Sequence, residues 1–364
     1  MMQLFALPLA SHHAPCRVFL AQTRHPVASE PGYPVCVIQS VQSGLRKVRC
    51  VMFRPWAIAA LVSCQLAGCV TPVAAPPVAP IAPPPQLTIP APAPAISPES
   101  EAARAYFAQV QARLLSQGLL RSDGGTTDAP FTDSMLAANF TRVALYDEYA
   151  NTPTGPVQRE TASRLRRWEG PVRVGLRFGA SVAADKRATD TARIASYLAR
   201  LQMLTGHPIR LDDANPNFIV QVVNEDERRA LGPSILSTLP GLTPSDVRGI
   251  TDLPRSTYCL VYAFAEGGSS TYTRAYAVIR AEHPDLLRLS CFHEEIAQGL
   301  GLANDSPAAR PSIFNDDEEF ALLTPQDERM LRILYDPALQ TGMTEAEARP
   351  IINSLAARLM NSDS

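Results

Sequence analysis

Residues 99–364 are predicted to form one α+β domain, and three observations indicate this class. Segments with strand and helix periods alternate first, two strand-like segments then flank the turn Gly267–Ser270, and only helical segments follow. This order is typical of helices gathered around a mixed sheet. We expect no core before residue 99, because the preceding segments lack both periods.

The first half of this domain begins with a helix that starts at Ser97-Pro98-Glu99, where a Ser cap precedes Pro and acid in the first turn. This helix is expected to end at Gly118. The further predicted elements are a helix over 135–149, a strand over 172–178, a helix over 191–204 and a strand over 218–223.

The second half contains a long excursion, Leu231–Arg255, which is rich in Pro, Gly and Ser. We expect one short helix in it, and the sequence leaves open whether it covers the functional site. The other predicted elements are a hairpin of strands 258–264 and 272–279, and helices over 284–300, 325–334 and 344–358.

The N-terminal part of the chain carries signs of export. The apolar run Trp56–Val62 has the length of a signal-peptide core, with Arg54 ahead of it. The next small residues, Leu66-Ala67-Gly68-Cys69, resemble the lipobox of bacterial lipoproteins, which implies that the Cys69 thiol carries diacylglycerol. Met52 is then the start, 52–68 the signal peptide and 1–51 a mis-called, disordered extension. An ordinary signal peptide or a chance match are the alternatives.

Residues 69–98 are predicted to be a linker behind the lipidated cysteine. They are almost entirely Pro, Ala, Val and Thr, a composition that favours extended polyproline II. We therefore expect a domain held on the membrane by lipid, in the cell envelope and facing the periplasm, with the outer membrane favoured over the inner. The whole chain carries −2 and residues 1–68 carry +5, which leaves −7 for 69–364 and argues against nucleic acid as a partner.

Cleavage before Cys69 leaves three of the seven cysteines. If Cys69 carries lipid, Cys259 and Cys291 remain as an even pair in an oxidising compartment, and a disulfide is the simplest outcome. Two unrelated buried thiols are the alternative.

The segment 292–306 is the most informative for chemistry. A zinc motif H-E-x-x-H that starts at His293 fails, because Ala297 occupies the second ligand position. Aligned on Leu300-Gly301-Leu302, the segment instead resembles the metzincin motif, especially its matrixin form. The resemblance implies that Glu294, Gln298 and Asn304 take the places of the three zinc-binding histidines, that Gly301 turns the chain back, and that Glu295 takes the place of the general base.

The resemblance continues downstream, where Phe314 stands in place of the methionine below the metal. Residues 323–335 resemble the matrixin C-terminal helix, and the likeness spans about 170–337. It implies a metzincin-like (zincin) domain with a mixed sheet, a central motif helix and C-terminal helices.

The chain as a whole resembles domain of unknown function family 2927 of bacterial secreted proteins and lipoproteins. This resemblance implies a fold and no activity. It rests on Asn139-Phe140, Val143-Ala144-Leu145, Leu165, Trp168, Thr205-Gly206, the 294–305 motif, Ser312–Asp316 and Leu334–Pro337.

The substituted ligand positions argue against zinc hydrolysis. A neutral amide oxygen is a poor zinc ligand. The all-oxygen set of Glu294, Gln298 and Asn304 suits Ca²⁺ or Mg²⁺ better but offers few ligands for either ion. We therefore expect no cofactor and a hydrogen-bond network in the metal's place, with a hard divalent ion or zinc as the alternatives; Glu295 is the one catalytic candidate. The histidines after residue 69, His207, His283 and His293, are expected at the surface or in turns.

These observations predict a non-proteolytic, lipid-anchored envelope protein that binds a peptide or another protein, with β-strand addition as the mode. A metallohydrolase with unusual ligands and a structural lipoprotein without a ligand remain the alternatives. The sequence leaves the oligomeric state open.

Overall fold

The computed structural model describes residues 17–22, 96–152, 155–239, 242–315 and 317–362. All of them belong to one compact unit, Met1–His25 with Pro92–Ser364. The expected lipidation site Cys69, the expected signal peptide 52–68 and most of the expected linker 69–98 lie outside the described residues. Within the described ranges, no helix combines the length and apolar character needed to cross a bilayer.

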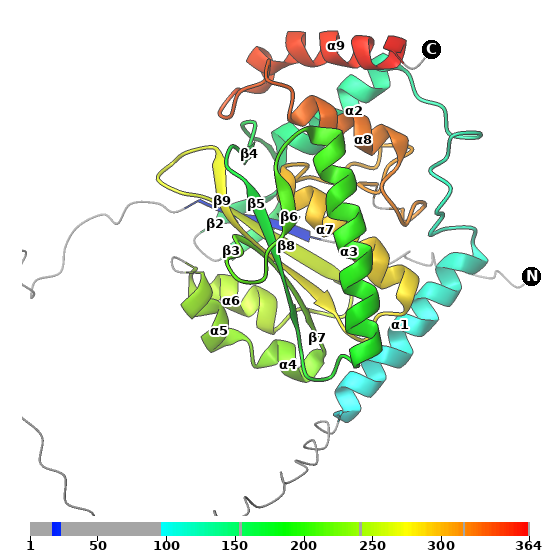
Figure 1. Cartoon of the computed structure of the whole chain (residues 1–364), viewed down its shortest axis with the longest axis vertical. Helices are drawn as coiled ribbons and strands as arrows, with labels where there is room; N and C mark the ends of the chain where they lie inside the picture. Colours follow the sequence, from blue (N-terminus) through cyan, green and yellow to red (C-terminus); the bar gives the residue numbers. More distant parts are fainter. Residues whose placement is uncertain (1–16, 23–95, 153–154, 240–241, 316, 363–364) are drawn as a thin grey trace, which may run out of the picture. The chain divides into compact units, whose positions relative to one another are not determined.

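A mixed, mostly parallel sheet forms the centre of the unit, as the sequence predicts (Figure 1). Its order is β1-β8-β9-β7-β5-β6, and a short β4 also pairs with β9. All neighbours run parallel except β8 and β9, which form the predicted antiparallel hairpin. The strands are β1 Arg17–Gln22, β4 Arg167–Trp168, β5 Val172–Phe178, β6 Ile209–Leu211, β7 Phe218–Val223, β8 Cys259–Ala265 and β9 Thr271–Arg280.

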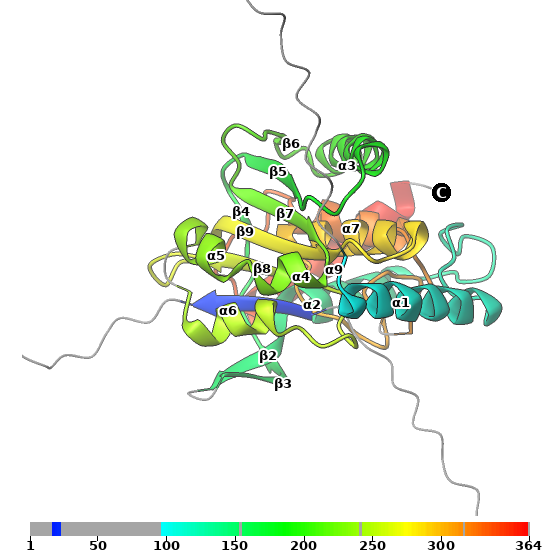
Figure 2. The same ribbon diagram turned by 90° about the horizontal axis from the view of Figure 1, so that it is seen from below.

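Helices cover both faces of this sheet (Figure 2). One face packs against the main core, to which α3 Ala184–Thr205, α7 Asp285–Leu300 and α8 Pro325–Leu334 contribute. A smaller core lies on the other face, where Leu260, Tyr262 and Phe264 of β8 meet three short helices. These helices are α4 Glu225–Arg229, α5 Gly232–Thr238 and α6 Pro244–Thr251.

The 231–255 excursion therefore holds two helices, α5 and α6, instead of the one expected. Its apolar residues pack on the sheet face opposite α7, because alternate β8 side chains point to opposite faces. The described part of the excursion thus lies on the sheet face away from the motif helix, which answers the question the sequence left open.

The other predicted helices are present, with differences at three ends. Helix α1, Pro98–Ser116, begins at the expected Ser97 cap, and α9 spans Glu345–Ser362. Helix α3 starts at Ala184, seven residues before the predicted start, and α9 continues four residues beyond the predicted end at 358. Helix α2, Asp133–Leu145, stops four residues before the predicted end, because Tyr146 is already extended and opens a second, two-stranded sheet. That sheet consists of β2 Tyr146–Thr152 and β3 Gly155–Ala162.

Two further features concern strand β8. Its first residue, Cys259, forms the predicted disulfide with Cys291 of α7 and so joins the strand to the motif helix. Its outer edge pairs with β1, which lies in the N-terminal extension for which the sequence indicates no regular structure. An extended segment, Arg17–Gln22, thus pairs with the outer edge of β8 in this structure.

Candidate functional site

The motif helix α7 is buried along its whole C-terminal half. Every residue from Phe292 to Leu300 is buried, and the helix ends at Gly301 with φ +131°. A Cβ at Gly301 would lie 2.4 Å from the backbone oxygen of Arg166. The backbone at Arg166 packs so closely against this position that only glycine fits. The expected turn at Gly301 is therefore present, and it leads the chain back to Asn304.

Two of the three residues at metzincin ligand positions act as hydrogen-bond braces. Asn304 donates from Nδ2 to the backbone oxygen of Arg142 at 3.0 Å, and its own N–H donates to the oxygen of Val143. It thereby satisfies two carbonyls in the last turn of α2, which lack partners within the helix. Gln298 donates from Nε2 to Asp305 at 2.9 Å.

The two glutamates of the motif lie beside this arrangement. Glu294 is 8% exposed, and Glu295, the one catalytic candidate, is fully buried. Among the described residues, no three His, Cys, Asp or Glu side chains gather in a group that could hold a metal ion. A cavity of about 350 Å³ opens beside the motif, lined by Arg142, Glu160 and residues 304–308.

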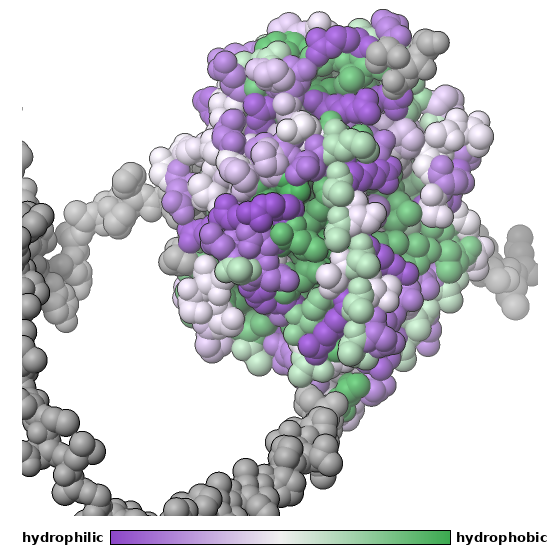
Figure 3. Space-filling view, in the orientation of Figure 1, coloured by the Kyte–Doolittle hydropathy of each residue, from purple (hydrophilic) through white to green (hydrophobic). Residues whose placement is uncertain are grey.

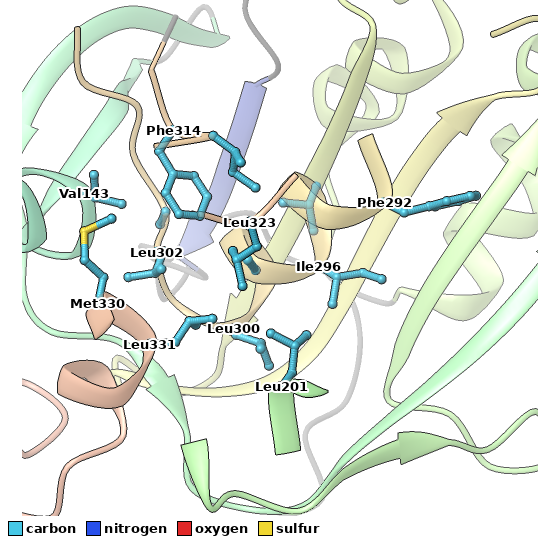
Figure 4. Packing of buried hydrophobic residues seen from close by; sticks show 14 of the residues in the cluster. Val143, Leu201, Phe292, Ile296, Leu300, Leu302, Phe314, Leu323, Met330 and Leu331 are labelled. Carbon is cyan, nitrogen blue, oxygen red and sulfur yellow. The ribbon is translucent and has the colours of Figure 1, made fainter. Parts of the chain in front are cut away.

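Phe314 lies fully buried in the apolar cluster below the motif helix, together with Leu302 and Leu323 (Figure 4). Val143 of α2 and Met330 of α8 belong to the same cluster. An aromatic ring thus fills the position that the resemblance assigns to the methionine below a metal.

Asp327 fastens this turn to helix α8. One carboxylate oxygen accepts from the hydroxyl of Ser312, and the other accepts from the N–H of Ile313 at 3.1 Å and from the N–H and hydroxyl of Thr324 at 2.8 Å each. Burial raises the pKa of Asp327 to about 6, although these hydrogen bonds favour the charged form. The hydrogen bonds between Asp327 and Thr324 could have been inferred from the sequence, because the two residues have the spacing of a capping box.

The histidines correct one sequence expectation. The sequence suggested surface or turn positions. His283 is buried but lies in the turn between β9 and α7, whereas His293 is buried within helix α7, where the expectation is wrong. The His293 ring stacks on Tyr197 with centroids 4.0 Å apart, and its Nδ1 accepts from the N–H of Leu323 at 3.2 Å. Burial lowers its pKa to about 3, so it stays neutral and braces α7 against the chain before α8.

The comparisons with known proteins bear on these same residues. A family model described as protein of unknown function, DUF2927, matches residues 133–354. The chain belongs to the DUF2927 family. No curated protein and no solved structure matches it.

Several residues that carry the DUF2927 resemblance have structural roles. Asn139 donates to Gln326 at 2.9 Å, which joins α2 to α8. The indole N–H of Trp168 donates to the backbone oxygen of Gly299 at 2.8 Å, and Gly206 takes the left-handed conformation that ends α3. These partners are distant in the sequence, so periodicity alone does not reveal them.

Proposed function

We propose that this DUF2927 chain is a lipid-anchored protein of the bacterial cell envelope, with a metzincin-like, non-proteolytic domain that binds an extended segment of a peptide or protein. The order of elements supports the fold assignment: strand β5, helix α3, strands β6 and β7, the β8–β9 hairpin, motif helix α7, the Phe314 turn and helix α8. The resemblance to metzincins implies the order strand, helix, strand, hairpin and motif helix; this chain has the additional strand β6 and the helices α4–α6 between β7 and β8.

The observation that carries the non-proteolytic assignment is the use of Gln298 and Asn304 as braces. A zinc hydrolase needs ligands that are free to point at one metal, with a further position open for water. Here the Asn304 amide caps helix α2 and the Gln298 amide holds Asp305. Both side chains stabilise the return of the chain after Gly301, which is a structural role.

Strand β8 supports peptide binding by strand addition. Six residues of the N-terminal extension, Arg17–Gln22, pair in parallel with Leu260–Ala265. A mature chain that begins at Cys69 lacks those six residues, and the outer N–H and C=O groups of β8 then face solvent. An exposed edge of this kind accepts an extended segment through main-chain hydrogen bonds.

Among the described residues, the exposed apolar side chains form no docking surface as well defined as the edge of β8. The large apolar side chains that are exposed lie on separate helices, namely Tyr106 and Leu115 on α1, Met135 on α2, Met203 on α3 and Leu236 on α5. Polar residues interrupt the apolar areas on the face seen in Figure 3. The edge of β8 is therefore the better candidate for a docking surface.

A cross-linking experiment tests binding at this edge. A photo-cross-linking residue is placed at Glu266, an exposed position directly after β8, and a control is placed at Met203, which is 77% exposed on α3 beside the opposite sheet edge. With the gene expressed from Met52 in bacteria, we expect an envelope adduct from position 266 and none from 203. No adduct at 266, or equal adducts at both positions, contradicts the proposal.

Metal analysis of the same protein tests the enzymatic alternative. We expect substoichiometric zinc and a domain that stays folded in chelator. Stoichiometric zinc that is lost in Glu294→Ala would establish a metallohydrolase-type site instead.

Mass analysis of the N-terminus tests the anchor, since diacylglycerol on Cys69 is expected and Cys69→Ala should abolish it.

A further inference from the structure

A second cavity lies at the other end of the sheet from the motif. Its volume is about 360 Å³, and its wall includes Arg228, Arg229 and Arg255 together with Glu225 and Asp252. Glu225 follows β7 closely, and Arg280 ends β9, where it pairs with Val223 in the parallel register. The cavity is therefore outside the carboxyl ends of parallel strands, where ligands of α/β sheets commonly bind.

The motif lies at the amino ends of these strands. A Cβ on Gly299 would lie 2.5 Å from the ring of Phe218, the first residue of β7, so α7 has by then returned to the start of the sheet. The two sites are separate, and the inference below is independent of the proposed function.

Positive charge is in excess around the cavity. One carboxylate, that of Glu225, pairs with three guanidinium groups, at 2.7 Å from Arg228, 2.9 Å from Arg229 and 2.8 Å from Arg280. Burial and the adjacent charge of Arg228 lower the pKa of Arg280 to about 10, despite Glu225 and Glu282. An additional anion would offset this repulsion.

The side chain of Arg228 has an unused donor at this site. It is 1% exposed, and its terminal nitrogens donate to Glu225 and to the backbone oxygens of Ile250 and Thr251. Its Nε–H is buried and has no acceptor within the described part of the chain. Buried guanidinium donors normally find partners, which makes this one a marker of a ligand position.

Two exposed guanidinium groups complete the wall. Arg229 is exposed beside Glu225, and Arg255 is exposed with one hydrogen bond inside the described part of the chain, a 3.4 Å contact to the backbone oxygen of Glu99. Both can reorient toward a ligand without disturbing the core. Several guanidinium forks around one polar cavity match the geometry of a phosphate group, which accepts bidentate bonds on several sides.

We propose that the Arg228–Arg229–Arg255 cavity binds a phosphate group, either of free phosphate or of a phospholipid headgroup. Isothermal titration of inorganic phosphate into the full chain, at constant ionic strength set with chloride, is expected to show saturable binding to one site. The variant Arg229→Gln/Arg255→Gln should weaken it at least about tenfold, the effect of losing charge-assisted hydrogen bonds.

A matched control separates a specific site from general attraction. Arg210→Gln/Arg248→Gln removes the same charge from two exposed positions that do not line the cavity. It should bind phosphate within about twofold of the natural chain. Absence of binding to the natural chain, or equal losses in both variants while circular dichroism shows them folded, overturns the proposal.

Vesicles distinguish the two sources of phosphate. Sedimentation with phosphatidylglycerol and with phosphatidylcholine vesicles is compared for the natural chain and both variants. Binding to phosphatidylglycerol that depends on Arg229 and Arg255 and is displaced by inorganic phosphate assigns the site to a headgroup. Calorimetric phosphate binding without vesicle binding assigns it to the free ion.

Discussion

The carboxylate of Asp327 is expected to control both the stability of the motif turn and its dependence on pH. Asp327→Ala removes the acceptor and leaves the buried N–H groups of Ile313 and Thr324 without it. Each orphaned buried donor costs about 1–3 kcal/mol, so we expect the free energy of unfolding to fall by about 2–6 kcal/mol.

Asp327→Asn should behave differently. Its amide oxygen can still accept from Ile313 and Thr324, and its NH₂ can donate to the Ser312 hydroxyl. The variant keeps the hydrogen bonds and loses the buried charge. At pH 4, where the carboxyl of Asp327 is protonated in the folded state, we expect a stability within about 1 kcal/mol of the natural chain.

The pH dependence follows from the raised pKa of Asp327, about 6 in the folded state against 3.8 as the ordinary value. Between these values the folded state binds more protons at this group than the unfolded one, so the contribution of Asp327 to stability is greatest below pH 4 and is lost as the pH rises through 6. A difference of about 2 in pKa corresponds to about 3 kcal/mol. Asp327→Asn lacks this contribution, so it gains about 2–3 kcal/mol relative to the natural chain between pH 4 and pH 7.

Urea unfolding at pH 4, 5, 6 and 7 measures these changes, with the buried Trp168 as a fluorescent probe. Asp252→Asn, which removes an exposed carboxylate, is the control and should leave the pH profile unchanged. Parallel profiles for the natural chain and Asp327→Asn would refute the reasoning, as would a loss below 1 kcal/mol in Asp327→Ala.

Three further predictions concern the motif and its surroundings. Gly301→Ala should lower the free energy of unfolding by about 2–5 kcal/mol, since backbone strain at positive φ and a clash with the backbone of Arg166 combine. The control Gly118→Ala is also at positive φ but in open space, and it should lower the free energy of unfolding by only about 1 kcal/mol in the same urea assay. Cys259→Ser/Cys291→Ser opens a 32-residue span and should cost about 4 kcal/mol, whereas equal unfolding midpoints with and without reductant would contradict this. Asn304→Asp should destabilise more than Asn304→Ala, because a carboxylate faces carbonyls at a helix C-terminus; improved metal binding by Asn304→Asp would instead indicate a ligand.

Local sequence signals predicted much of this fold. The Ser97 cap, the alternation in Val172–Phe178 and the glycine after Leu300 each act over a few residues, and each element appears where these signals place it. The disulfide was also predictable, because removing the cysteines up to Cys69 leaves a single pair. Family resemblance supplied the motif register.

Long-range partners were beyond these signals. Asn304 bonds to the oxygen of Arg142, 162 residues earlier, and Asp327 gathers donors from a turn that precedes it by about a dozen residues. The wall of the arginine cavity joins residues after β7 to residues before β8, and only the folded sheet brings them together. The burial of His293 likewise depends on Tyr197 from another helix.

The bond between Cys259 and Cys291 has a consequence for the order of maturation. In the exported protein that we propose, the cytosolic precursor would be kept reduced, so the hairpin strand and the motif helix would not yet be covalently joined there. A contribution of about 4 kcal/mol is a large part of the 5–15 kcal/mol that stabilises a typical domain. On that proposal the chain would reach its final stability only after oxidation, and the redox state of its surroundings would act as a checkpoint between synthesis and use.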